Sequence, residues 1–283
     1  MHPDKLIINA AITGCVLQKA DNPHLPISKD EIVKSVQSVV SAGASIVHLH
    51  ARLAGGQPSF EPEHYSDIVE GVRATCPEVV VCVSLSGRHV QDIEQRSAPL
   101  LSSPDMASLT LGSLNFPTQA SINPPDTICE LARRIYAANA VPELEIFEPG
   151  FVHYSKTLIK REILKPPLFY NLILGSLGSA PVDLLGLGHM VSLLPPDSIW
   201  AVGGIGRFQL QANMLAIASG GHVRVGLEDN PYFDKERTTL ATNLRLVERL
   251  VRIASEMGRE PATPGEVRKL LNIKAAQYSA SQL

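Results

Sequence analysis

The chain has 283 residues, of which 45% are hydrophobic and 19% are charged, and its formal net charge at pH 7 is −3. This composition is typical of a globular protein with a large core, and the scattered Lys and Arg residues offer no basic face for a nucleic acid. No apolar run reaches the length of a membrane span and the start shows no signal-peptide pattern, so we expect a cytoplasmic protein without a membrane partner.

Short apolar runs rich in β-branched residues recur along the chain, each followed by a turn and an amphipathic segment. Apolar strands that alternate with helices are typical of a parallel sheet covered on both faces. Eight such units favour a closed (β/α)8 barrel, a TIM barrel, over an open doubly wound sheet, which would carry a GxGxxG turn after its first strand. The predicted strands cover residues 6–14, 45–52, 79–87, 106–116, 143–150, 168–175, 198–206 and 222–230.

The segments between these strands have the ends of amphipathic helices. Ser28 and Glu31 form a capping box in front of an apolar i, i+3/i+4 stripe that stops at Gly43. A second long stripe, at 240–251, follows the eighth strand. These patterns predict helices that cover the outside of the barrel.

The chain contains no linker rich in Pro, Gly and Ser, so we expect one domain over residues 1–283. The C-terminal helix and tail after about residue 260 are expected to pack outside the barrel, and the end beyond Asn272 to fray or to reach a neighbouring subunit. The cysteines form no CxxC pair and are interpreted as small buried hydrophobic residues. They are Cys15, Cys76, Cys82 and Cys129.

The second predicted strand ends in HLHAR, which places His48 and His50 two residues apart. Side chains alternate along a strand, so both imidazoles point to the same face. Active sites of these barrels lie at the carboxyl ends of the strands, where this pair falls. The pair is either structural or part of a metal site, because catalytic zinc takes three protein ligands, often two histidines and a carboxylate.

Strands three to five end in small polar or acidic residues that are candidates for substrate binding. Ser84, Ser86 and Gly87, in SLSG, offer hydroxyl groups and close backbone amides suited to a carboxylate. Ser108 and Thr110 alternate inward on the fourth strand, where they bind substrate or satisfy neighbouring backbone groups. Glu145 is flanked by apolar residues on the fifth strand, so it needs a polar partner or a cation.

The seventh strand ends in GGIGR, which is similar to the phosphate-binding turn that often follows this strand in barrels. Arg207 is therefore a candidate contact for an anionic cofactor. The alternative is a tight turn that needs the conformational freedom of glycine.

The eighth strand ends in RVGLED, which puts Arg224 and Glu228 on one face at i, i+4. The eighth strand of a closed barrel adjoins the first, so Glu228 lies across a small mouth from the histidine pair. Glu228 is either the third metal ligand or a rim carboxylate paired with Arg224. Asp229 begins the following loop and is either a catalytic base or a turn residue.

Seven segments of the chain carry a resemblance to a known family. They are NAAITG, NPHLPIS, AGASIVHLHAR, MASLTLGSLNF, PELEIFEPG, WAVGGIGR and GGHVRVGLEDN. Together they resemble the β-keto acid cleavage enzymes, whose first characterised activity is the cleavage of 3-keto-5-aminohexanoate. The similarity covers nearly the whole chain, and the motifs of the second and eighth strands are the specific ones.

The resemblance implies a zinc-dependent homotetramer in which a β-keto acid and acetyl-CoA give acetoacetate and a new acyl-CoA. The implied zinc ligands are His48, His50 and Glu228. The implied contacts of the substrate are Ser84, Gly87, Ser108 and Glu145. In the same way, Asp229 would act as the base and Arg224 would orient it.

The chain departs from the family pattern in two places. In the 3-keto-5-aminohexanoate enzyme a glutamate follows the ITGA-like motif and meets the amino group of the substrate, whereas ITGC is followed here by Val16. A buried ammonium facing valine would lack a partner, so we expect a substrate without this amino group. The Ser-Thr-Gly-Gly cradle of the family reads SLSG here, which alters the cradle but not the metal site.

Two other functions match parts of the pattern. A metal-dependent hydrolase barrel also uses an HxH motif and a late aspartate, but it places the motif on the first strand and adds histidines from strands five and six. Here the motif is on the second strand, and His153 and His189 are expected in loops beyond the strand ends. A catalytically inactive scaffold would not need the ligands, the base and the arginine together.

Overall fold

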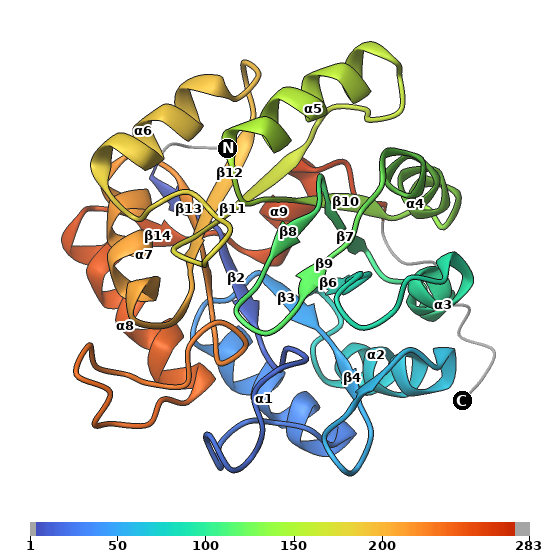
Figure 1. The fold of residues 1–283 in the computed structure, drawn as a ribbon. Helices are drawn as coiled ribbons and strands as arrows, with labels where there is room; N and C mark the ends of the chain where they lie inside the picture. Colours follow the sequence, from blue (N-terminus) through green and yellow to red (C-terminus); the bar gives the residue numbers. More distant parts are fainter. Residues whose placement is uncertain (1–3, 275–283) are drawn as a thin grey trace.

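A computed structural model describes residues 4–274, in which eight parallel strands form a closed barrel surrounded by helices (Figure 1). The strands follow one another around the barrel in chain order, and the last pairs with the first. They are β2 (Ile8–Ala11), β3 (Ile46–Leu49), β6 (Val80–Val83), β7 (Met106–Thr110), β10 (Val141–Ile146), β11 (Phe169–Leu174), β12 (Ile199–Gly204) and β13 (His222–Val225). The predicted (β/α)8 barrel is confirmed.

Helices cover the outside of the barrel, and each barrel strand is followed by at least one of them. They are α1 (Lys29–Ser41), α2 (Pro62–Thr75), α3 (Ile93–Ser97), α4 (Pro125–Ala137), α5 (Pro149–Lys160), α6 (Leu184–Leu193), α7 (Gln209–Ala218), α8 (Asn243–Glu256) and α9 (Pro264–Leu270). Two 3₁₀ turns, η1 (Ala98–Ser102) and η2 (Gly206–Phe208), complete this layer. None of the helices described in residues 4–274 combines the length and apolar character that a bilayer crossing requires.

The ends of two helices show how local sequence sets their limits. The Ser28 hydroxyl accepts a hydrogen bond from the Glu31 amide and the Glu31 carboxylate accepts one from the Ser28 amide, so the predicted capping box starts α1. The stripe predicted at 240–251 becomes helical only at Asn243. Thr242 caps α8 there, and Leu240 forms an isolated β-bridge with Tyr232.

The segment after residue 260 covers the amino-terminal end of the barrel rather than its flank. Inward apolar side chains at this end form one cluster with α9 and the residues after it; its members include Ile46, Met106, Phe169, Val267, Leu271 and Ile273. Arg268 of α9 donates two hydrogen bonds of 2.8 Å to Asp105 at the start of β7. Of the tail predicted to fray beyond Asn272, Ile273 packs into this cluster instead, and residues 275–283 lie outside the described part of the chain.

Above this apolar cluster the interior of the barrel becomes polar. The buried inward side chains of this layer include Asn9, His48, Cys82, Glu143, Asn171 and Arg224. Polar groups are buried at such density only when they are paired or hold a ligand, so this layer marks the functional end of the barrel.

Short two-stranded sheets complete the loops. β1 (Lys5–Leu6) pairs with β14 (Glu260–Pro261), and β4 (Ala51–Arg52) pairs with β5 (Pro58–Ser59). The strand predicted at 106–116 ends as β7 at Thr110, and its last part turns into the hairpin of β8 (Leu114–Asn115) and β9 (Ala120–Ser121), which lies in front of the barrel strands in Figure 1. This hairpin forms part of the wall of the cavity described below.

Candidate metal centre and active site

Three side chains converge at the carboxyl end of the barrel: His48 on β3, His50 directly after it, and Glu228 in the loop after β13. Nε2 of His50 lies 3.3 Å from Nε2 of His48 and 3.3 Å from Oε1 of Glu228. Nε2 of His48 lies 3.8 Å from Oε2 of Glu228. Two ligands of a tetrahedral zinc ion with bonds of about 2.1 Å lie about 3.4 Å apart. The three groups therefore have the spacing of ligands that share one ion.

The Glu228 carboxylate has a negative charge and an unpaired oxygen atom, as a ligand of a cation needs. Its Oε2 atom is buried and has no hydrogen-bond partner among residues 4–274. Burial would raise the pKa of Glu228, but the Arg224 guanidinium and the two imidazoles hold it well below its usual range. An ionised carboxylate oxygen that is buried without a partner is costly, and an ion between the imidazoles would satisfy it.

Glu143, which we did not single out from the sequence, anchors the metal-site histidine from inside the barrel. Its Oε2 lies 2.7 Å from Nδ1 of His48, and its Oε1 accepts hydrogen bonds from Asn9 at 2.5 Å and Asn171 at 3.0 Å. Burial would lower the pKa of His48, but Glu228 and Glu143 raise it to about 8. With Nδ1 held by Glu143, Nε2 faces the other ligands, and an ion there competes with a proton.

A second group of potential ligands, His48, Cys82 and Glu143, lies deeper in the barrel. The oxygens of Glu143 are already occupied, since Oε1 accepts from two amides and Oε2 accepts from the Cys82 thiol at 3.2 Å. Burial raises the pKa of Cys82 well above its usual value, so the thiol stays protonated. These residues do not line the cavity. The deeper group supports the metal site rather than forming a catalytic site with an open position.

Arg224 connects the metal ligand to the predicted base. Its Nη2 donates to Oε1 of Glu228 at 2.8 Å, and its Nε donates to Oδ2 of Asp229 at 2.9 Å. Its Nη1 is buried without a hydrogen-bond partner in the described residues and lies 3.9 Å from Oε1 of Glu145. Burial raises the pKa of Asp229 against the effect of Arg224, which suits a general base. The free Nη1 is positioned to donate to an oxygen atom of a bound substrate.

A cavity of about 260 Å³ opens beside this group of charges. Its lining includes the ligands His50 and Glu228, both charged partners Arg224 and Asp229, and residues from the loops after the other strands. Those from the loops and the hairpin are Cys15, Val16, Leu17, Ser84, Ser86, Arg88, Leu114, Phe116, Pro117, Thr118, Ser121 and Pro231. The remaining lining residues are Thr110, Glu145, Phe147, Ile173, Ser176 and Ile205.

The predicted substrate residues differ in their access to this cavity. Ser84, Thr110 and Glu145 line it, whereas Gly87, in the loop after β6, and Ser108, on β7, do not. Oγ of Ser108 accepts a hydrogen bond from the amide of Leu85, which fixes this loop. A Cβ on Gly87 would lie 2.8 Å from the Arg96 guanidinium, so a side chain has no room there. Both residues shape the cradle rather than line it.

The loop after β6 also presents Ser86, a predicted part of the cradle, and Arg88, which we did not single out from the sequence. Oγ of Ser84 accepts from the amide of Ser86 at 3.3 Å, and Oγ of Ser86 accepts from the amide of Arg88 at 3.2 Å. In both hydroxyl groups the proton remains free to be donated into the cavity. Arg207, in η2 after β12, is exposed and lies outside the cavity lining.

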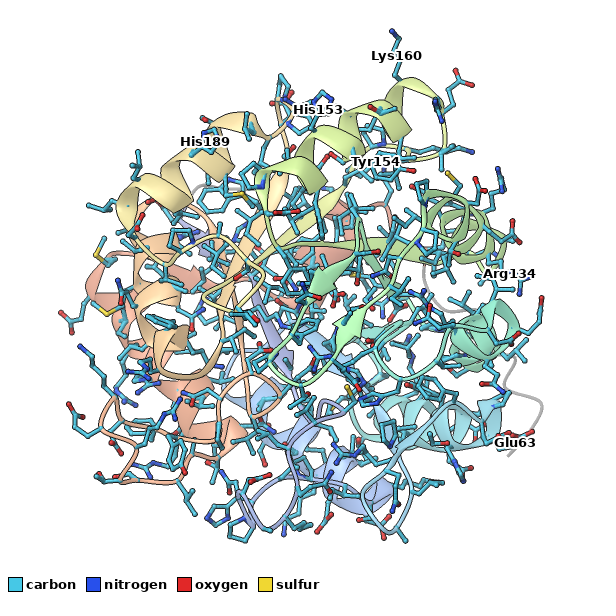
Figure 2. All side chains as sticks on the ribbon, in the orientation of Figure 1. Glu63, Arg134, His153, Tyr154, Lys160 and His189 are labelled. Carbon is cyan, nitrogen blue, oxygen red and sulfur yellow. The ribbon has the colours of Figure 1, made fainter. Side chains whose placement is uncertain are left out.

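The expectation that His153 and His189 lie in loops is wrong. Figure 2 shows them on α5 and α6, at the outside of the molecule, and both are exposed. Their helices begin at Pro149 and after the capping Asp183, so both histidines fall within helices. These histidines therefore do not complete the ligand set that a hydrolase barrel would need.

Comparisons with known proteins show the family of the chain. The sequence profile of the family described as beta-keto acid cleavage enzyme matches residues 5–273. A 3-keto-5-aminohexanoate cleavage enzyme of Fusobacterium nucleatum subsp. nucleatum is 38% identical over 96% of this chain and 99% of its own. A 3-oxoadipate:acetyl-CoA acetyltransferase of Cupriavidus necator is 37% identical over 96% of each chain. A 3-dehydrocarnitine:acetyl-CoA trimethylamine transferase of Rhizobium meliloti is 28% identical over 95% of this chain and 97% of its own.

Solved structures share the barrel. The apo structure of ObcA matches with a TM-score of 0.79 and 21% identity, over 89% of this chain and 66% of that chain. The ternary complex of ObcA with C4-CoA adduct and oxalate matches with a TM-score of 0.75 and 21% identity, over 88% and 68%. At this identity the likeness shows the fold alone.

Proposed function

Because the chain belongs to the family of β-keto acid cleavage enzymes, as its motifs predict, we propose that it exchanges the acyl group of a β-keto acid with that of acetyl-CoA. The products are acetoacetate and the acyl-CoA derived from the β-keto acid. The observation that carries the proposal is the spacing of His48, His50 and Glu228 beside the Arg224–Asp229 pair, at one end of a cavity.

The three ligands make zinc the proposed cofactor. A zinc ion held by His48, His50 and Glu228 would act as a Lewis acid toward the ketone and carboxylate oxygens of the substrate, which lowers the pKa of the methylene group between them. Asp229 accepts the methylene proton, and the guanidinium of Arg224 keeps the aspartate in place. The hydroxyl group of Ser84 donates a hydrogen bond to the substrate carboxylate.

The bond changes then balance without any further reactant. The carbanion attacks the thioester carbon of acetyl-CoA, and CoA thiolate leaves. The thiolate attacks the original ketone of the resulting diketo acid, and the bond between that carbon and the former methylene carbon breaks. This step releases the new acyl-CoA, and the remaining acetoacetate carbanion takes back the proton that Asp229 accepted.

The cavity favours a substrate without an amino group. Val16 lines it at the position that follows ITGC and is 49% exposed, so an ammonium there would keep part of its water but would gain no carboxylate. Glu145 is already used, because its Oε2 accepts a hydrogen bond from Thr110 at 2.5 Å and its Oε1 faces Arg224. Neither residue therefore supplies the counter-charge that an ammonium group needs.

Acetyl-CoA is the proposed co-substrate, and Arg207 its proposed phosphate contact. Arg207 is exposed in the turn after β12, at the carboxyl end of the barrel. Turns at this place bind phosphate in many barrels. An Arg207→Ala variant is expected to raise the KM for acetyl-CoA while leaving the KM for the β-keto acid unchanged.

The homotetramer and the cytoplasmic location stay predictions. Leu184 and Leu185 at the start of α6 are 76% and 84% exposed, which is compatible with an interface between subunits. Light scattering on the purified protein measures the oligomeric state directly.

The decisive experiment incubates the purified, zinc-loaded protein with acetyl-CoA and a panel of β-keto acids. We expect acetoacetate and the new acyl-CoA in a 1:1 ratio, with loss of turnover after dialysis against a chelator and recovery on addition of zinc. Free CoA without acyl-CoA would indicate a hydrolase. Failure to form acetoacetate from every member of the panel would refute the proposed reaction.

A further inference from the structure

We propose that Arg88 selects a β-keto acid that carries a second carboxylate at the end distant from the reacting ketone. This inference rests on the proposed function and names its substrate class as β-keto dicarboxylic acids. It starts from an arginine in the cavity wall whose charge no described residue neutralises.

Arg88 lies in the loop after β6 and lines the cavity. Its Nε atom is buried and has no hydrogen-bond partner, and its guanidinium forms no ion pair with any carboxylate among residues 4–274. Two buried arginines that contact the neighbouring loops donate to protein groups instead. Arg96 donates to the Leu85 carbonyl and to Asn123, and Arg52 donates to three backbone carbonyls.

The guanidinium is held in position in advance of any ligand. Its central carbon lies 3.4 Å from the centroid of the Phe116 ring, and Phe116 packs edge-on against Phe147. The Arg88 carbonyl also accepts a hydrogen bond from Gln119 at 2.9 Å, which joins the loop to the β8–β9 hairpin. An aromatic face under the guanidinium leaves the N–H groups at its edge free for a planar anion. A group that is already ordered loses little entropy when it binds.

The charged residues that line the cavity come from two groups of elements. Arg224, Glu228 and Asp229 form the reacting end, where the ketone and the first carboxylate bind in the proposed reaction. Arg88 and Phe116 belong to the wall formed by the hairpin and the loop after β6. A β-keto acid with a methylene chain between its ketone and a second carboxylate would place that carboxylate on the free guanidinium. A cationic group at this place would be repelled.

The relative named 3-oxoadipate:acetyl-CoA acetyltransferase carries a β-keto dicarboxylate in its name, which is compatible with this class. A phosphate of CoA is the other anion that could reach an arginine at the site. We favour the substrate carboxylate because Arg88 lines the cavity, whereas Arg207, the proposed phosphate contact, lies outside it. The experiment separates the two sources through the KM for acetyl-CoA.

The test compares 3-oxoadipate with 3-oxohexanoate, which has the same number of carbons but a methyl group in place of the second carboxylate. We expect the wild type to prefer the diacid. Arg88→Met should lower kcat/KM for the diacid about 30-fold or more, since it removes one partner of a charged, hydrogen-bonded pair. The same variant should change kcat/KM for the monoacid by less than about threefold. Arg88→Lys should restore part of the preference, because it keeps the charge but not the planar fork.

The control is Arg133→Met, which removes an exposed arginine of α4 and should leave kcat/KM unchanged for both substrates. A binding measurement adds a readout that does not depend on turnover. In titration calorimetry, adipate should bind the wild type more tightly than hexanoate does, and Arg88→Met should remove the difference.

Three results would overturn the inference. The first is an equal loss of kcat/KM on both substrates, which indicates a structural role or contact with the shared carboxylate. The second is a raised KM for acetyl-CoA with both substrates, which indicates that Arg88 binds a CoA phosphate. The third is a wild type that prefers the monoacid. Absence of turnover with every β-keto acid would instead refute the proposed reaction. In that event the comparison of adipate with hexanoate still decides whether Arg88 recognises the second carboxylate.

Discussion

Nδ1 of His48 lies 2.7 Å from Oε2 of Glu143, so a carboxylate behind the metal site determines which imidazole nitrogen faces the other ligands. Glu143 is itself held by Asn9 and Asn171, from the barrel strands β2 and β11. The orientation of the ligand is therefore built into the barrel interior and does not depend on a loop. Residues that hold a ligand in place without touching the metal determine much of the affinity of a metal site.

We first predict that Glu143→Gln weakens zinc binding about 10- to 100-fold, because an amide in this place no longer offers His48 a carboxylate. Glu228→Gln removes a ligand and should leave less than one ion in ten chains after dialysis. Affinity is measured by competition with a chromophoric chelator, and metal content by elemental analysis.

Glu148→Gln is the control for these variants, because Glu148 is an exposed residue that caps α5 without a side-chain hydrogen bond and should keep full metal content. If Glu143→Gln lost more metal than Glu228→Gln, the ion would be assigned to the deeper group of His48, Cys82 and Glu143. A Glu143→Gln variant that loses all metal while Glu228→Gln keeps one ion per chain would be that result.

The second prediction concerns the base. Asp229→Asn should keep one ion per chain, because the ligands are unchanged, but should lower kcat at least about 100-fold, since proton transfer by a positioned group contributes that much. NMR can follow the exchange of the substrate methylene protons for deuterium in the absence of acetyl-CoA. The rate of this exchange should fall in parallel with kcat. Exchange at the wild-type rate would remove Asp229 from this role.

The barrel and the convergence of the candidate metal ligands were accessible from the sequence for a physical reason. Alternation along a strand places His48 and His50 on one face regardless of what surrounds them, and barrel closure brings the last strand beside the first. These relations depend on the chain's order and periodicity, so the approach of Glu228 to the histidine pair follows from them. The same alternation places Glu143 on the face of Glu145, so the supporting carboxylate could have been predicted.

The cavity wall was less accessible, because it depends on where loops fold back. The segment at 106–116 reads as one apolar strand, and only the tertiary structure shows that it breaks at Thr110 and forms a hairpin over the barrel. The position of Phe116 under Arg88 follows from that hairpin. Ser108 and Gly87 were chosen for their chemistry, yet neither lines the cavity, because Ser108 holds the loop after β6 from behind and Gly87, within that loop, packs against Arg96.

The third prediction tests how closely the backbone approaches the metal ligand. Gly14 has φ +66°, and a Cβ there would lie 2.6 Å from Cγ of Glu228. Gly14→Ala should therefore displace the carboxylate and weaken zinc binding, although no ligand is replaced. Its control is Gly220→Ala, where φ is +79° and no atom lies within 4 Å of the added Cβ. Both variants should lose about 1 kcal/mol of stability from backbone strain, and only the first should lose metal affinity. Equal metal affinity in the two variants would contradict this geometry.

The fourth prediction concerns the opposite end of the barrel, where Asp105 joins α9 to the strands. Oδ1 and Oδ2 of Asp105 accept hydrogen bonds of 2.8 Å from Arg268, and Oδ2 also accepts from the Val81 amide and from buried Arg73. Asp105→Asn leaves two arginines without their counter-charge in a largely buried place, so it should lower the free energy of unfolding by about 3–5 kcal/mol.

Urea denaturation followed by tryptophan fluorescence measures this loss. The matched variant Glu130→Gln breaks ion pairs on the exposed side of α4 and should cost less than about 1 kcal/mol, because water screens and replaces such pairs. Metal affinity should be unchanged in both variants, since the apolar cluster of the lower barrel separates Asp105 from the ligands. If Asp105→Asn were no more destabilising than Glu130→Gln, the pairing with Arg268 would not be what holds α9 against the barrel, and the apolar contacts of Val267 and Leu271 would have to suffice.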